Sequence, residues 1–133
     1  MIIVRRSFGM AVVAAVLAIG GLLPAQADST VPYSDEAFKA AQASGQSILV
    51  EIHAGWCPTC KAQKPIIDKL AAAPKFKDLK IFRVDFDDMK PAVQAFGAKM
   101  QSTLIVFKGA KETGRSVGDT REASIAGLLE KSL

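Results

Sequence analysis

Residues 54–61 read Ala-Gly-Trp-Cys-Pro-Thr-Cys-Lys, and this stretch decides the fold because it joins two predicted elements of different type. The residues before it, 47–54, are rich in β-branched side chains and apolar on both faces except for Glu51 and His53, which is typical of a central strand covered on both faces. The residues after it, 58–73, predict a helix with Pro58 in its first turn. The two cysteines therefore lie where a central strand ends and a helix begins.

Cys57 and Cys60 have the spacing and the position of a reactive dithiol. The unpaired amides and positive dipole of the helix N-terminus stabilise a thiolate on Cys57 and make it a nucleophile. Cys60 follows one helical turn later on the same face, within reach of a disulfide, and is expected to be more enclosed. An inert structural disulfide is the alternative, but so short a loop removes little entropy from the unfolded chain. The pattern thus favours a redox pair in which Cys60 resolves mixed disulfides formed by Cys57.

The rest of the chain alternates predicted helices and strands without repeats or a linker. Such alternation implies a three-layer α/β/α domain with a central mixed sheet. An Asp119–Glu122 capping box is expected to start the last helix, which would run to the C-terminus. The other predicted helices are 33–44 and 89–96, and the other predicted strands are 79–87, 103–107 and 112–117.

Composition excludes several classes of protein. The chain has 133 residues, half of them hydrophobic, which is enough for one small domain. Its 17 basic and 13 acidic residues are interspersed without a basic run, so nucleic-acid binding is disfavoured. Cys57, Cys60 and His53 would supply only three ligands, and a closed zinc site would need another molecule. We therefore expect no metal and no cofactor.

The first 27 residues have the features of a signal peptide. A short basic start precedes 15 apolar or glycine residues, 9–23, and residues 24–27 have the A-x-A form of a cleavage site. The apolar run spans only about 22 Å as a helix, against about 30 Å of hydrocarbon, so an uncleaved membrane tether is the weaker alternative. We expect cleavage after Ala27, a mature domain of residues 28–133, and a periplasmic location. Arg5-Arg6 also resembles a twin-arginine signal, so the export route stays open.

From residue 37 to Leu133 the ordered motifs resemble those of the thioredoxin family. They are the strand and dithiol stretch through residue 61, Pro65 five residues after Cys60, Phe96-Gly97, residues 103–109, and Val117-Gly118. The resemblance implies a thioredoxin fold, with the leading family strand short or absent. It also implies thiol–disulfide exchange in which Cys57 attacks and Cys60 resolves.

Three more residues near the dithiol have candidate roles, the first of them implied by the resemblance. Glu51 falls where the family carries a buried acid; a carboxyl in an apolar strand has a raised pKa and could accept the Cys60 proton through water. The alternative is a structural ion pair with Arg83 on the next strand. His53 lies on the same strand face, as a structural histidine or as a group that tunes the thiolate. Trp56 would shield the dithiol and offer a surface to substrates, unless it is plain packing.

One position departs from the family. The family places a cis-proline immediately before Thr103, opposite the dithiol, and this chain has Ser102 there. A cis bond without proline costs about 3 to 4 kcal/mol, so we expect a trans bond or a strained loop. In the family this loop pairs with the backbone of the bound substrate. Ser102 and Thr103 are therefore candidate substrate-binding residues.

The residues between the two cysteines do not by themselves decide the direction of electron flow. Pro58-Thr59 matches neither the Gly-Pro pair of cytosolic reductants nor the Pro-His pair of the strong periplasmic oxidase. An acid at Glu51 and the lack of an inserted helical domain favour a reductase of periplasmic protein disulfides. The resemblance points to a membrane thiol transporter as electron donor, and we expect a monomer. A disulfide oxidase or isomerase, and a metal- or protein-binding module without turnover, remain the alternatives.

Overall fold

The computed structural model describes residues 29–133. The predicted signal peptide at residues 1–27 lies outside this part of the chain. Within residues 29–133, no helix is both long enough and apolar enough to cross a bilayer.

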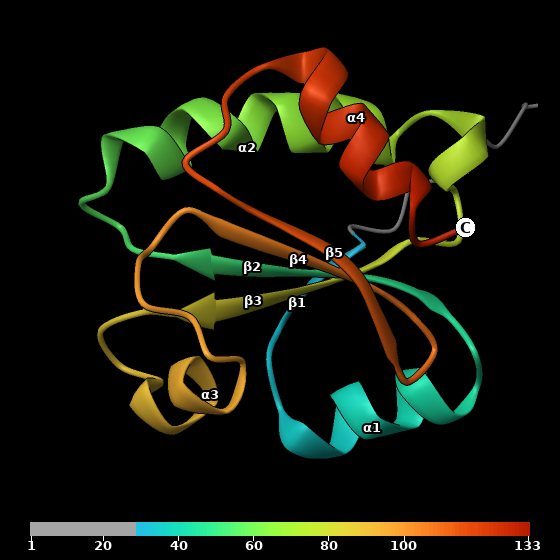
Figure 1. Cartoon of the computed structure of the whole chain (residues 1–133), viewed down its shortest axis with the longest axis horizontal. Coiled ribbons are helices and arrows are strands. Elements are labelled where there is room, and N and C mark those ends of the chain that lie inside the picture. Colours follow the sequence, from blue (N-terminus) through green and yellow to red (C-terminus); the bar gives the residue numbers. More distant parts are fainter. Residues whose placement is uncertain (1–28) are drawn as a thin grey trace, which may run out of the picture.

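A mixed sheet forms the middle layer of the described residues (Figure 1). Its strand order is β1-β3-β2-β4-β5, so the strand that precedes the dithiol lies at the centre. β1 and β2 run parallel to β3, whereas β4 runs antiparallel to both β2 and β5. The leading strand is present but only three residues long, which confirms the expectation of a short one. The strands are β1 (Thr30–Pro32), β2 (Ser47–His53), β3 (Lys80–Asp85), β4 (Thr103–Lys108) and β5 (Lys111–Val117).

Helices cover both faces of the sheet. Figure 1 shows α2 and α4 on one face and α1 and α3 on the other, which completes the predicted three layers. The side chain of Ser34 caps α1, accepting the Ala37 N–H at 3.2 Å. The helices are α1 (Asp35–Ala43), α2 (Pro58–Ala71), α3 (Lys90–Ala95) and α4 (Glu122–Glu130), with a short 3₁₀ turn, η1 (Pro74–Phe76).

The alternation of side chains along β2 explains why the functional residues face α2. Ile48, Val50 and Ile52 are fully buried in the core shared with α1 and α3. Leu49 points the other way, into the core beneath α2 and α4. Because successive side chains alternate between faces, Glu51 and His53 follow Leu49 toward α2. Burial of each large aliphatic side chain contributes roughly 1.5 to 3 kcal/mol, which fixes the register of this strand.

The expected start of the last helix is wrong by two residues. Arg121, not Asp119, is the residue that precedes α4, and no side chain caps the helix. The Asp119 carboxylate instead accepts the Arg121 N–H at 3.0 Å and also binds the Ser124 hydroxyl. This turn bond, two residues along the chain, competes with the capping geometry and delays the helix. α4 also ends at Glu130, before the C-terminus.

Candidate redox site

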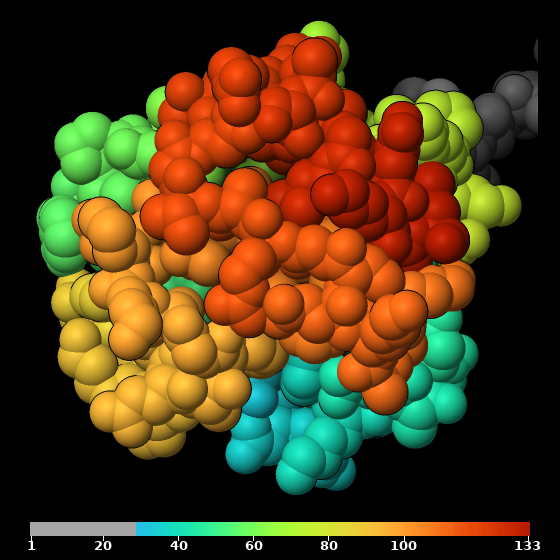
Figure 2. All heavy atoms as spheres, viewed as in Figure 1, coloured from blue at the N-terminus to red at the C-terminus, as the bar shows by residue number. Residues whose placement is uncertain are grey.

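The dithiol lies at the N-terminus of α2, as the sequence predicts. Cys57 is the residue immediately before the helix, with extended backbone angles, and its sulfur accepts the Cys60 N–H at 3.1 Å. Both cysteines are free thiols and both are buried. The expectation that Cys60 is the more enclosed one is wrong, since 1% of Cys57 and 4% of Cys60 are exposed. Figure 2 shows the green start of α2 at one end of the molecule, beside the gold segment that includes α3. The Cys57 sulfur thus faces the unpaired amides and the positive end of the helix dipole.

The second thiol lies in a different environment. Burial raises the pKa of Cys60, and the hydrogen bond to Cys57 raises it further. The backbone at Ala54 and at Ser102 acts in the opposite direction, lowering the same pKa. Cys60 is therefore hard to ionise unassisted, and its use as a nucleophile calls for a nearby proton acceptor.

Glu51 is a buried carboxylate with one cationic partner. Nε of Arg83 donates to Oε2 of Glu51 at 3.0 Å, and Nη2 lies 3.0 Å from the same oxygen. Burial raises the pKa of Glu51 above its ordinary value, and the charge and hydrogen bond of Arg83 oppose the rise without cancelling it. The ion pair considered from the sequence is thus present, and the carboxyl still holds its proton more tightly than in water.

Glu51 and Cys60 border the same small cavity. Its volume is about 10 Å³, roughly the space that one water molecule needs. Glu51, Cys60, His53, Gln63 and Arg83 are among the residues that line it. The geometry therefore suits proton transfer between Cys60 and Glu51 through a single water.

His53 lies between this cavity and the outside. It lines the small cavity and also an outer pocket of about 320 Å³ beside β1 and β3. Burial lowers the pKa of His53, and the charge of Arg83 lowers it further, whereas Asp85 raises it. A pKa below the ordinary value keeps the imidazole neutral near pH 7.

Trp56 is an exposed side chain next to the dithiol. Its relative exposure is 58%, and its Nε1–H donates to Oδ2 of Asp87 at 2.6 Å. This bond fixes the indole to the loop that follows β3. Met100 and Val117 are also exposed. Met100 lies just before β4, and Val117 pairs with Thr103 at the start of β4, beside the end of β2 that leads to the dithiol. These side chains leave apolar surface at the end of the sheet where β2 stops.

Ser102 has the strained loop that the sequence predicts. Among residues 29–133 every peptide bond is trans, and Ser102 has a φ of 61°, in the left-handed region. Its N–H donates to the Ile52 carbonyl at 2.7 Å, and its carbonyl accepts the Gly118 N–H at 3.0 Å. The neighbouring Thr103 is buried, and its hydroxyl donates to the Met100 carbonyl at 2.7 Å. The contacts of both residues with a substrate remain predictions.

The sequence pattern misses Gln63. This residue is buried on the α2 face that carries Cys60, three positions later, and its side-chain amide donates to the Ser102 carbonyl. A polar residue at helical spacing from a reactive cysteine was the available signal.

Comparison with known proteins decides the family. The Thioredoxin family model matches residues 29–131. The chain belongs to the thioredoxin family. Thioredoxin H-type of Brassica oleracea is 32% identical over 123 residues, which cover 92% of this chain and 96% of that protein. The thioredoxin of Chlamydia muridarum is 36% identical over 98 residues, covering 74% of this chain and 93% of that one.

Solved structures agree with this family. The crystal structure of Trxlp from Edwardsiella tarda EIB202 aligns with a TM-score of 0.74 and 44% identity, covering 75% of this chain and 97% of that chain. The thioredoxin fold is therefore established. The protein is a thioredoxin-like thiol–disulfide oxidoreductase, a protein-disulfide reductase whose redox-active pair is Cys57 and Cys60.

For a thioredoxin with this buried acid, we expect a pH dependence of stability that E51Q removes. Because the pKa of Glu51 is raised by folding, the folded state binds its proton more tightly than the unfolded state does. Stability should therefore fall as pH rises from the ordinary carboxyl value of 4.5 through the raised value. Urea unfolding of the reduced protein between about pH 4 and pH 9 measures this slope.

The matched control is E112Q, since Glu112 also pairs with an arginine, Arg115, but lies exposed on the edge strand β5. E112Q should keep the wild-type slope, whereas E51Q should be flatter in that window. Equal slopes for wild type and E51Q would contradict the assignment of the slope to Glu51.

Proposed function

We propose that this thioredoxin-family protein is exported and reduces protein disulfides in the periplasm. The proposed location rests on residues 1–27, whose basic start, apolar run and A-x-A site have the order of a secretory signal. The proposed activity rests on the cysteine pair at the N-terminus of α2. The observation that carries it is the Cys57 sulfur held at 3.1 Å from the Cys60 N–H.

The reaction proceeds by two thiol–disulfide exchanges. The Cys57 thiolate attacks one sulfur of a substrate disulfide; a mixed disulfide forms, and the other substrate sulfur leaves as a thiolate that takes a proton from water. The Cys60 sulfur then attacks Cys57, which releases the second substrate thiol and leaves a Cys57–Cys60 disulfide. The substrate gains two electrons and the dithiol loses two.

Glu51 is the proposed acceptor of the Cys60 proton during the second exchange. This proposal is supported by the small cavity that Glu51 and Cys60 both line. Ionised Glu51 accepts a proton through one water, and its raised pKa makes this transfer more favourable than transfer to an ordinary carboxylate.

The substrate surface surrounds the buried sulfurs. We assign the exposed Trp56 ring to contact with the substrate protein, and the Ser102–Thr103 backbone to the region opposite the dithiol. After turnover, a membrane thiol transporter would return two electrons to the Cys57–Cys60 disulfide. The protein is proposed to act as a monomer on disulfide-containing periplasmic proteins.

The reduction potential tests the direction of electron flow. Equilibrated with glutathione, the purified protein should give a potential of about −230 to −270 mV and should catalyse insulin reduction. A value near about −120 mV would overturn the proposal in favour of an oxidase, whose reduced form is the more stable one.

Export has a separate test. The full chain, expressed in a Gram-negative host with a C-terminal tag, should appear in the periplasmic fraction. Its mass should be that of a chain whose first residue is Asp28. Recovery of the uncleaved chain in the cytoplasm would overturn the proposed location, and recovery in the membrane would support the tether instead.

A further inference from the structure

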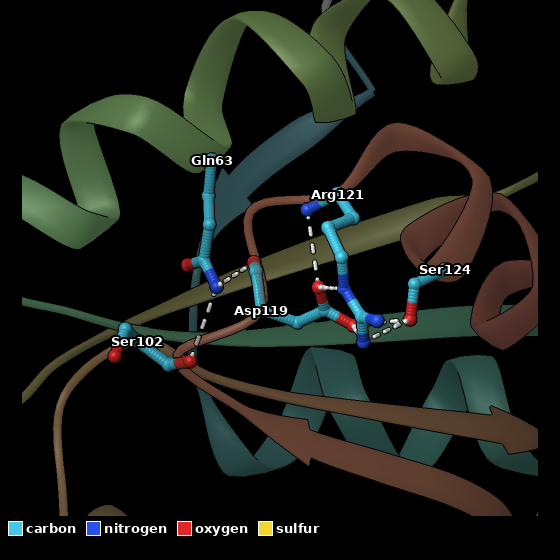
Figure 3. A network of polar contacts seen from close by, with 5 residues as sticks. All are labelled: Gln63, Ser102, Asp119, Arg121 and Ser124. Atoms are coloured by element: carbon cyan, nitrogen blue, oxygen red, sulfur yellow. Dashed lines mark hydrogen bonds and ion pairs between the residues drawn. The ribbon is translucent and has the colours of Figure 1, made fainter.

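Gln63 is a buried polar side chain that connects three segments around the dithiol. It projects from α2 with only 3% of its surface exposed. Its Nε2 donates to the carbonyl of Ser102 at 3.3 Å and to the carbonyl of Asp119 at 2.9 Å. Figure 3 shows the amide reaching from the helix to both carbonyls. Because a buried amide is costly unless paired, both bonds hold Gln63 in this orientation.

The Ser102 loop needs such support. A serine with a φ of 61° occupies a region that non-glycine residues rarely adopt, and surrounding contacts must maintain it. Here these contacts are the N–H of Ser102 to Ile52, the N–H of Gly118 to Ser102, and the Gln63 amide. Proline would constrain its own backbone, whereas this serine is constrained by hydrogen bonds.

The second partner of Gln63 is itself anchored. The Asp119 carboxylate accepts the Arg121 N–H at 3.0 Å and Nε–H at 3.1 Å, and it also binds the Ser124 hydroxyl (Figure 3). The turn before α4 therefore offers a fixed carbonyl. Gln63 joins this fixed turn to the Ser102 loop, and both to the helix of the dithiol.

The Gln63 hydrogen bonds act on Cys60 through the Ser102 loop. Gln63 and Cys60 line the same small cavity, one helical turn apart on α2. The Ser102 N–H donates to Ile52, which lines the same cavity as Cys60 and Gln63. The backbone at Ser102 also lowers the pKa of Cys60, against the larger rise that burial causes. A shift of the loop would remove that help from the residue that must release the substrate.

We propose that Gln63 is a positioning residue of the redox site, which holds the Ser102 loop against Cys60 by bridging the Ser102 and Asp119 carbonyls. The inference rests on the proposed reductase function, since it concerns the resolving step of that reaction. The hydrogen bonds of the Gln63 side chain go to the Ser102 and Asp119 carbonyls. Its effect passes through the loop.

The test compares Q63M and Q63E with S47A. Q63M keeps the length of the side chain and removes the donor, and Q63E replaces the donor with an acceptor that faces two carbonyls. S47A removes a different buried bond, from the Ser47 hydroxyl to the Ser132 carbonyl at 2.7 Å, at the opposite end of β2 from the dithiol. S47A therefore reports on lost stability alone.

In a C57S background, the pH dependence of Cys60 alkylation is followed by mass spectrometry. Loss of one supporting hydrogen bond should move the midpoint upward by about one pH unit in Q63M, and by more in Q63E. S47A should leave the midpoint unchanged. With both cysteines present, Q63M should slow resolution of a mixed disulfide about tenfold and change the initial attack by Cys57 little.

Midpoints that match wild type in Q63M and Q63E would overturn the proposal, as would an equal shift in S47A. If one Gln63 variant does not fold, the other decides, and the alkylation assay needs no turnover. Failure of wild type to reduce insulin would count against the reductase function, while the alkylation midpoints would still decide the role of Gln63.

Discussion

Replacing Cys57 with serine is expected to abolish disulfide reduction, with a loss of about a thousandfold or more in kcat/KM. A serine hydroxyl does not ionise near neutral pH and cannot form a mixed disulfide, so the first exchange has no nucleophile. Stability should change little, because serine can still accept the Cys60 N–H that the sulfur accepts at 3.1 Å in wild type. Insulin reduction and urea unfolding of the same preparation measure the two effects.

Replacing Cys60 with serine should stop the reaction at the mixed disulfide between Cys57 and the substrate. The C60S variant attacks substrates through Cys57 but cannot resolve the product, so mixed disulfides with natural partners should accumulate. Non-reducing electrophoresis of a periplasmic extract, followed by mass spectrometry, identifies them. The C57S/C60S double variant is the matched control and should capture nothing. Capture by C57S but not by C60S would reverse the roles assigned to the two cysteines.

Much of this fold is predictable from the sequence because its central strands are buried on both faces. Residues 47–54 are apolar apart from Ser47, Glu51 and His53, and residues 103–107 apart from Thr103; such runs end where polar or turn residues begin. The predicted strands therefore agree with β2 and β4 within one residue at each end. The dithiol site is equally predictable from the sequence, because its chemistry depends on a strand-to-helix junction that the local sequence encodes.

Contacts between distant segments were harder to predict. The Glu51–Arg83 pair could be proposed because neighbouring strands of the sheet were expected to place the two residues side by side. Gln63 was missed because its partners are main-chain carbonyls, which any sequence provides, 39 and 56 residues away. Asp119 was misassigned because an aspartate can cap a helix or close a turn, and the local pattern is the same for both.

Ser102→Pro is expected to destabilise the protein by about 3 kcal/mol or more. Proline fixes φ near −65°, whereas residue 102 has a φ of 61°, and proline lacks the N–H that donates to the Ile52 carbonyl at 2.7 Å. The substitution thus removes one bond of the loop and forces rotation of the backbone that forms the other two. Urea unfolding of the reduced protein measures the loss.

Ser102→Gly separates the two causes of this loss. Glycine adopts a positive φ freely and keeps the N–H, so this variant should be within about 1 kcal/mol of wild type. If S102P were as stable as wild type, residue 102 would accept the backbone that the family's proline imposes, and the left-handed conformation would not be required. If S102G were instead as unstable as S102P, the serine side chain rather than the backbone would hold the loop. The expected order, with glycine close to wild type and proline far below it, follows from a loop maintained by hydrogen bonds to its main chain.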